Sequence, residues 1–164
     1  MLERMASIRS RIGENMKDRY LFKAKRIDWR EFPEKEQWII GYYVLGFNEY
    51  EQPVHLIFEP TSMFFSHGET DGWTEIDPST ICQCTGLKDK NGKLIWENDI
   101  IECKDGKRNF QTQIEWDAYC AGFIFQDTET SAVGLDAITA NGLYSESKVI
   151  GNIFDNKDLL ESEE

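Results

Sequence analysis

The sequence predicts a mainly β protein, with at most an α+β arrangement, and three observations support this fold class. Short runs rich in β-branched and aromatic residues recur along the chain, turn-forming residues separate them, and no stretch sustains the apolar periodicity of a helix. At 164 residues with 40% hydrophobic residues, the chain can bury a core. The second half, from Thr80 onward, has about the number of strands that a small open β-barrel needs.

The N-terminal portion is predicted to be β-rich over residues 16–75. Residues 1–15 are basic and differ in composition from the rest of the chain, and Gly13-Glu14 can be encoded by a purine-rich ribosome-binding sequence a few nucleotides before Met16. We therefore expect Met16 to be the biological start, and residues 1–15 to be a translated leader or a disordered extension. Strands are predicted over 20–25, 38–45 and 54–58, with a loop over 27–37, a turn over 48–53 and a long aromatic loop over 59–75.

The C-terminal portion, residues 76–160, is predicted to form the small barrel. Asp77-Pro78 favours a turn that Asp77 and Ser79 cap, and Asn91-Gly92 favours a type I′ hairpin because both residues tolerate positive φ. Further strands are predicted over 80–85, 94–96, 99–104, 108–116, 122–125 and 149–154. A tight turn is predicted at 105–106, and a loop over 127–147 with one helical turn at 135–138. The chain is predicted to end with a second helical turn over 155–160 and a frayed acidic tail over 161–164.

Three ordered motifs resemble the YopX-like family of phage and prophage proteins. Residues 20–24 read Tyr-Leu-Phe-Lys-Ala, residues 76–100 carry Ile-Asp-Pro-Ser-Thr-Ile, Thr-Gly-Leu-Lys-Asp-Lys-Asn-Gly-Lys and Ile-Trp-Glu-Asn-Asp-Ile, and residues 149–156 read Val-Ile-Gly-Asn-Ile-Phe-Asp-Asn. The resemblance covers residues 16–160. This sequence departs from the family pattern at three positions. Cys84 stands where the family often has an aromatic residue, Asn98 where it usually has glycine, and Lys157 where proline is common.

This resemblance implies a fold and a source but no chemistry. It implies an SH3-like open β-barrel in the C-terminal half and a phage or prophage origin. The family has no established biochemical activity, so no catalytic residue is carried over and no cofactor is expected. Asp99 is interpreted as a bend residue whose carboxylate accepts backbone N–H groups.

The charge distribution bears on possible partners. The net charge is −12, with nine Lys and Arg against four Asp and Glu in residues 1–30, and nine against twenty-six in residues 31–164. Such an acidic body disfavours nucleic acid, whereas its contrast with the basic start suits homo-oligomer formation. No apolar run approaches the roughly 20 residues that span a bilayer. A soluble, intracellular protein is therefore expected, and its four cysteines are expected to be reduced thiols. With the phage or prophage origin that the resemblance implies, the expected compartment is the cytoplasm of a bacterial host.

Two groups of residues are weak candidates for metal binding. His67, Glu69 and Asp71 form an H-x-E-x-D arrangement that could offer nitrogen and carboxylate ligands, although loops collect polar residues for other reasons. Cys82 and Cys84 form a C-x-C pair, which is closer than the usual spacing of zinc ligands and equally typical of cysteines in a half-buried strand. We expect His55 to be a packed or surface histidine.

The aromatic loop is the best candidate for an interaction site. Its apolar side chains, Met63, Phe64, Phe65 and Trp73, either cover the core or contact another chain. No Gly-rich phosphate loop, nucleophile elbow or catalytic triad spacing is present. The sequence thus favours a non-enzymatic module for protein–protein contact or self-assembly, with itself or a host protein as partner. The alternatives are a small metal- or ligand-binding enzyme that uses the His67 loop, and a nucleic-acid-binding barrel.

Overall fold

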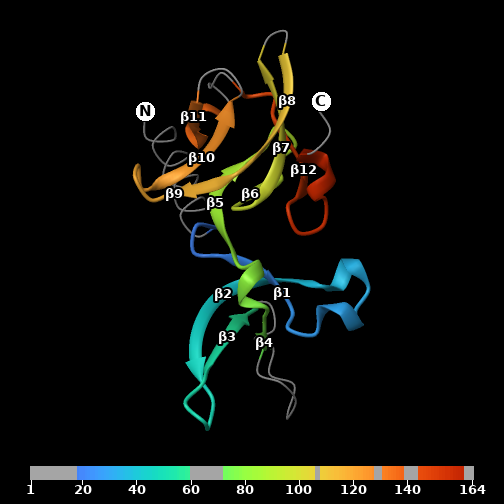
Figure 1. The fold of residues 1–164 in the computed structure, drawn as a ribbon, viewed down its shortest axis with the longest axis vertical. Coiled ribbons are helices and arrows are strands. Elements are labelled where there is room, and N and C mark those ends of the chain that lie inside the picture. The colour runs from blue at the N-terminus through green and yellow to red at the C-terminus, as the bar shows by residue number, and fades with distance from the viewer. Residues whose placement is uncertain (1–17, 60–71, 106–107, 128–130, 139–143, 161–164) are drawn as a thin grey trace, which may run out of the picture. The chain divides into compact units, whose positions relative to one another are not determined.

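The computed structural model describes residues 18–59, 72–105, 108–127, 131–138 and 144–160. Throughout these ranges the regular elements are antiparallel strands and short 3₁₀ turns, which confirms the predicted mainly β class (Figure 1). They divide into two compact units, one within residues 16–83 and one within residues 84–164. No helix in the described residues is long and apolar enough to cross a membrane.

The N-terminal unit is a twisted antiparallel sheet whose strands follow the order β4-β3-β2-β1. The start of β5 pairs with β1 through Cys82 and Gln83. The predicted strands are confirmed with small shifts of their ends, but the predicted loop over 59–75 is wrong at its last three residues. Those residues form a strand too short to show a period, and its pairing with β3 stabilises it. The strands are β1 (Phe22–Lys25), β2 (Trp38–Phe47), β3 (Pro53–Phe58) and β4 (Trp73–Glu75).

The core of the N-terminal unit lies on one side of this sheet. Ala24, Ile39 and Ile57 are buried there together with Ile76, which the sequence placed at the start of the barrel portion. A single antiparallel bridge joins Ile76 to Arg26, so the end of β4 lies beside the end of β1. Gly41 has a steric role, because a Cβ atom at this position would overlap the backbone oxygen of Phe58. Any larger residue at position 41 would therefore push β2 and β3 apart.

A capped turn precedes β5 (Cys82–Lys88), as the sequence predicted. Residues Pro78–Thr80 form a 3₁₀ turn, and the Asp77 carboxylate accepts hydrogen bonds from the Ser79 backbone N–H and hydroxyl at 3.0 and 2.6 Å. The bond from the Ser79 side chain lowers the pKa of Asp77 from its ordinary value. Both bonds favour the ionised carboxylate.

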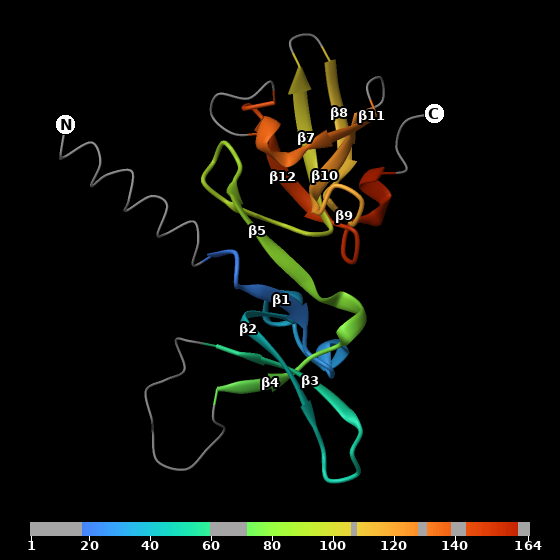
Figure 2. The same ribbon diagram turned by 90° about the vertical axis from the view of Figure 1, so that its left-hand side faces the viewer.

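The C-terminal unit contains two three-stranded sheets and the β5–β6 hairpin (Figure 2). One sheet has the order β12-β7-β8 and the other β11-β10-β9. Within the described ranges these sheets do not close into a barrel. The strands are β6 (Leu94–Trp96), β7 (Asp99–Asp105), β8 (Arg108–Gln113), β9 (Glu115–Asp117), β10 (Gly122–Asp127), β11 (Ser131–Gly134) and β12 (Lys148–Asn152).

Two predictions for this unit are wrong in detail. The predicted strand over 108–116 is interrupted at Ile114, whose N–H donates to the Asp99 carbonyl at 2.9 Å and whose carbonyl accepts from the Asn98 N–H at 2.8 Å. These long-range bonds divide the run into β8 and β9. The predicted loop over 127–147 contains β11, which pairs with β10. The predicted helical turns are confirmed as the 3₁₀ turns Leu135–Ile138 and Lys157–Leu160.

The hairpin between β5 and β6 also differs from the predicted type I′ turn. Gly92 has a φ of 81°, but Asn91 does not adopt positive φ, so the paired positive values that a type I′ turn requires are missing. Five residues separate the two strands instead, and the Gly92 N–H donates to the Asp89 carbonyl at 2.9 Å. The Asp89 side chain organises this longer loop.

Candidate functional site

Most of the predicted site residues lie outside the described residues. These are the weak metal candidates His67, Glu69 and Asp71 and the partner candidates Met63, Phe64 and Phe65. Trp73 is described. It lies in β4, its ring centroid is 4.8 Å from that of Phe58, and 44% of its surface is exposed.

The cysteines are free thiols, and three of them are buried. Burial, reinforced by the nearby Asp127 carboxylate, raises the pKa of Cys103 from its ordinary value of 9.0 to about 11. This thiol is therefore protonated at neutral pH and is a poor nucleophile and a poor metal ligand. Cys82 and Cys84 are buried strand residues. Across the ranges that the structure describes, no three His, Cys, Asp or Glu side chains are placed to hold a metal ion.

His55 is packed within the sheet. Its Nδ1 atom lies 2.8 Å from the Tyr43 hydroxyl, and the two rings stack with centroids 6.0 Å apart. Of the packed or surface position expected for His55, the structure shows a partly buried ring packed against Tyr43.

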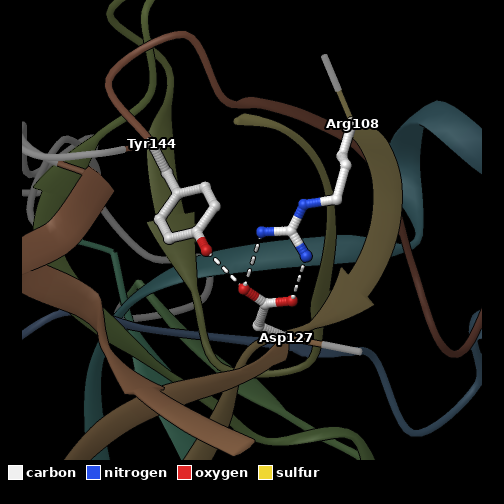
Figure 3. A network of polar contacts seen from close by, with 3 residues as sticks. All are labelled: Arg108, Asp127 and Tyr144. Carbon is white, nitrogen blue, oxygen red and sulfur yellow. Dashed lines mark hydrogen bonds and ion pairs between the residues drawn. The ribbon is translucent and has the colours of Figure 1, made fainter. Parts of the chain in front are cut away.

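A network of three side chains forms a buried polar arrangement in the C-terminal unit (Figure 3). Asp127 ends β10 and has no exposed side-chain surface. Its carboxylate accepts hydrogen bonds from Arg108 Nη1 and Nη2 at 3.2 and 3.4 Å, and from the Tyr144 hydroxyl at 2.5 Å. Arg108 is the first residue of β8 and Tyr144 lies in the segment before β12, so the network joins three segments of the chain.

This network is suited to stabilisation rather than to catalysis. Both oxygens of Asp127 accept hydrogen bonds within the protein, and the side chain is closed to solvent, so a substrate cannot reach the carboxylate in this structure. The Tyr144 ring makes edge-to-face contacts with Phe110 and Phe125 at centroid distances of 5.9 and 5.2 Å. The sequence gives no sign of the network, because its members are 17 and 19 residues apart in irregular spacing.

A second buried carboxylate, Asp89, links the hairpin to the last strand. One oxygen accepts the Asn91 and Lys93 backbone N–H groups at 2.8 and 2.9 Å, and the other accepts the Val149 N–H at 3.0 Å. The first two bonds lie within the hairpin loop, whereas the third joins Asp89 to a residue 60 positions away. Asp89 also borders a pocket of about 360 Å³ that is lined by Lys88, Lys90, Ile138, Ser145 and Glu146.

The bend residues of the motif behave as predicted. Asn98 has a φ of 66°, which explains how asparagine replaces the usual glycine at this position. The Asp99 carboxylate accepts the Trp96 backbone N–H at 2.9 Å. Asp77, Asp89, Asn98 and Asp99, all within the family motif, therefore serve as structural residues.

An apolar face is exposed on the sheet of the N-terminal unit. Residues on β2 alternate between the two faces, and Ile40, Tyr42 and Val44 share the face opposite Ile39 and Gly41. Their exposed fractions are 46%, 42% and 37%, which is high for three large apolar residues on one strand face.

The same face continues across the neighbouring strands. Tyr42 lies opposite Phe58, which lies opposite Trp73, and Val44 lies opposite Leu56. Paired residues of antiparallel strands point to the same side of a sheet. We call this surface the apolar face and define it by six residues: Ile40, Tyr42, Val44, Leu56, Phe58 and Trp73.

The hairpin of β2 and β3 exposes apolar side chains on its other face as well. Leu45 and Phe47 on this face expose 50% and 70% of their surface, and Tyr50 in the turn exposes 74%. The turn is well defined, because the Asn48 side-chain oxygen accepts the N–H groups of Tyr50 and Gln52 at 2.9 and 3.0 Å. The end of the hairpin is therefore an ordered two-stranded ribbon with apolar residues on both faces.

The fold and these surfaces define a small antiparallel β protein with exposed apolar strand residues. The model of the family described as YopX protein matches residues 30–161, and the chain belongs to this family. Among solved structures, the crystal structure of protein EF1440 from Enterococcus faecalis is similar, with 22% sequence identity, a TM-score of 0.45, and coverage of 86% of this chain and 96% of that chain. No curated protein matches the chain.

Proposed function

We propose that this protein is a non-enzymatic interaction module of a phage or prophage, and that it self-associates in the cytoplasm of a bacterial host. The observation that carries the proposal is the exposure of apolar side chains on both faces of β2, with Ile40, Tyr42 and Val44 on one face and Leu45 and Phe47 on the other. A monomer gains nothing by exposing these side chains, whereas burial against a partner stabilises the complex. The four free thiols fit a reducing compartment.

The exposure of these five side chains sets the expected strength of association. Each is about half exposed, and full burial of a large apolar side chain contributes about 1.5–3 kcal/mol, so each can contribute roughly 1 kcal/mol. Two copies then contribute roughly 10 kcal/mol. Because association costs at least about 4 kcal/mol, roughly 6 kcal/mol is left, which corresponds to a dissociation constant of about 40 µM.

The C-terminal unit has a core of its own and takes no part in the proposed association. We infer for it the SH3-like open-barrel arrangement that the family resemblance implies. The two three-stranded sheets of this unit contact each other where the Gln126 N–H donates to the Thr112 hydroxyl at 3.2 Å, which supports this inference. Ile95, Ile101, Phe110, Ile114 and Phe125 belong to the core that the strands share.

Sedimentation equilibrium of the full chain at concentrations up to about 500 µM tests the proposal. We expect the mass to rise with concentration above 19.1 kDa, and Phe47→Thr to weaken the association at least tenfold. Tyr119→Thr is the matched control, because Tyr119 is a fully exposed aromatic residue of the C-terminal unit. A wild-type protein that remains monomeric at 500 µM would refute self-association. If Phe47→Thr and Tyr119→Thr changed the dissociation constant equally, the β2 residues would not form the interface.

A further inference from the structure

The second half of β2 has an edge to which no described strand pairs, and we call it the free edge. β1 pairs only with Trp38–Gly41, and the chain turns away before Phe22, where the Leu21 N–H donates to the Asp18 carbonyl at 3.0 Å. β3 pairs with Tyr42–Phe47 from the other side, and the β2–β3 hairpin extends beyond β1 (Figure 1). Among the described residues, no strand pairs with the remaining edge of Tyr42–Phe47.

The hydrogen-bond pattern shows which residues direct their backbone groups to this edge. In an antiparallel pair, every second residue bonds to the neighbouring strand. The Asn48 N–H donates to the Gln52 carbonyl at 3.0 Å, so in the observed register the even-numbered residues of β2 bond to β3. The position of Pro53 agrees, because it lies opposite the odd-numbered Phe47 and has no N–H to donate.

The pairing with β1 gives the same assignment. The Arg26 N–H donates to the Gln37 carbonyl at 2.9 Å, so the odd-numbered residues of β2 bond towards the β1 side. Beyond the end of β1, these residues are Tyr43, Leu45 and Phe47. Their N–H and C=O groups therefore point to the free edge.

This edge lacks the features that prevent strands of different molecules from pairing. Exposed edge strands are commonly protected by charged residues, proline or a bulge. The ten residues Trp38–Phe47 contain no charged residue and no proline, and their pairing with β3 has no register shift. An uncharged apolar edge of this kind is suited to adding a further strand.

Identical strands that pair antiparallel are related by a two-fold axis, and here the backbone fixes where the axis passes. Only odd-numbered residues offer bonds to the edge, so odd-numbered residues must pair with each other. With the axis at Leu45, Leu45 lies opposite the partner's Leu45, and Tyr43 lies opposite the partner's Phe47. An axis at Val44 or at Gly46 would also pair odd-numbered residues with each other, but among Tyr43, Leu45 and Phe47 it would form only two hydrogen-bonded residue pairs, against three with the axis at Leu45. An axis at Tyr43 would bring the second strand against β1, and an axis at Phe47 would bring it against the hairpin turn.

We propose that two copies of this chain pair edge to edge through the second half of β2, antiparallel, with the two-fold axis at Leu45. The proposal rests on the proposed function and specifies the site and the register of self-association. Three hydrogen-bonded residue pairs give six backbone bonds across the axis. Cross-strand contacts between Leu45 and its copy, and between Tyr43 and Phe47, bury part of the exposed apolar surface.

Charged substitutions at the axis test the pairing. Because position 45 lies opposite itself, Leu45→Lys places two ammonium groups side by side, and Leu45→Glu places two carboxylates side by side. Each variant alone should dimerise at least tenfold more weakly than the wild type in sedimentation velocity at 50 mM salt. An equimolar mixture of the two should form a heterodimer with a dissociation constant close to that of the wild type, because opposite charges then face each other.

Matched controls separate this effect from a general effect of charge. Tyr119→Lys, Tyr119→Glu and their mixture carry the same charges at a fully exposed position of the C-terminal unit, and they should leave the dissociation constant within about twofold. At 500 mM salt, the difference between the mixture and the single Leu45 variants should shrink, because salt screens exposed charges. Circular dichroism verifies that each variant retains its strand content.

Disulfide cross-linking tests the register. In a Cys120→Ser background, which removes the exposed native thiol, Leu45→Cys should form a covalent dimer on oxidation, because Cα atoms of a hydrogen-bonded pair lie about 5.5 Å apart. Tyr43→Cys should not link to itself, but it should link to Phe47→Cys when the two variants are mixed.

The outcomes separate this proposal from the proposed function. A wild type that dimerises while neither Leu45 variant weakens the dimer would overturn the edge pairing and leave self-association through another surface, such as the apolar face. Efficient linking of Tyr43→Cys to itself would overturn the register. A strictly monomeric wild type would overturn both the proposal and the proposed function.

Discussion

Replacing Asp89 should destabilise the C-terminal unit far more than its position in a hairpin loop suggests. Its carboxylate is buried and accepts three backbone N–H groups at 2.8, 2.9 and 3.0 Å, two from its own loop and one from Val149 on β12. A hydrogen bond to a charged group contributes about 1.5–3 kcal/mol. Asn91 and Lys93 are exposed, so water can replace part of the two loop bonds, whereas the Val149 N–H is less accessible.

These contributions give an expected loss of about 3 kcal/mol for Asp89→Ala. For a unit of this size, that loss corresponds to a decrease in melting temperature of roughly 12–24 °C. Asp89→Asn should lose less, because it retains one oxygen that can accept from the loop, but its amide group cannot accept from Val149 and the loop at once. Asp158→Ala is the control, since Asp158 is exposed in the last 3₁₀ turn.

Urea denaturation followed by circular dichroism measures the free energy of unfolding, and amide hydrogen exchange reports the individual bonds. We expect the Val149 amide to lose protection in Asp89→Ala together with the amides of Asn91 and Lys93. A destabilisation below about 1 kcal/mol, or a Val149 amide whose protection does not change, would show that the role assigned to Asp89 is wrong.

Three further substitutions have defined outcomes. Tyr144→Phe removes one donor from the buried Asp127 carboxylate and should destabilise the protein by about 1–3 kcal/mol in urea titrations. Gly41→Ala places a Cβ atom against the Phe58 carbonyl and should cost more than about 3 kcal/mol, visible as early melting of the N-terminal sheet. The pKa of Cys103 is about 11 in the folded state against an ordinary 9.0, because folding favours the protonated thiol. The free energy of unfolding therefore keeps this contribution below pH 9 and loses up to about 2.7 kcal/mol as the pH rises to 11. Cys103→Ala should be less stable at pH 7 but should lose less stability between pH 9 and 11, and parallel pH curves for the two proteins would contradict this.

Local chemistry explains why much of the fold could be predicted. Three features of the motif depend only on residues close in the sequence. The structure shows the turn capped by Asp77, the positive φ of Asn98, and the Trp96 N–H that the Asp99 carboxylate accepts. The predictions were wrong where a distant partner decides. β4 exists because it pairs with β3, and the run from Arg108 is divided at Ile114 because that residue bonds to Asn98 and Asp99.

The candidate sites show the same division. Asp127 was predicted to be a loop residue, because nothing near it in the sequence indicates Arg108 and Tyr144 as partners. On β2, both faces of the strand are apolar, so alternation alone could not tell the buried face from the exposed one. The free edge of β2 became recognisable only when the pairing showed that β1 stops beside Gly41.

By itself, then, the sequence determined the mainly β class, the capped turn at Asp77, the bend at Asn98 and Asp99, and the YopX family, because these depend on residue type and short spacing. The tertiary structure alone decided which carboxylates are buried, which short segments become strands and which edge of β2 has no paired strand among the described residues. Those properties arise from pairing between segments far apart in the chain, and their free energy comes from burial and hydrogen bonds that no local pattern encodes.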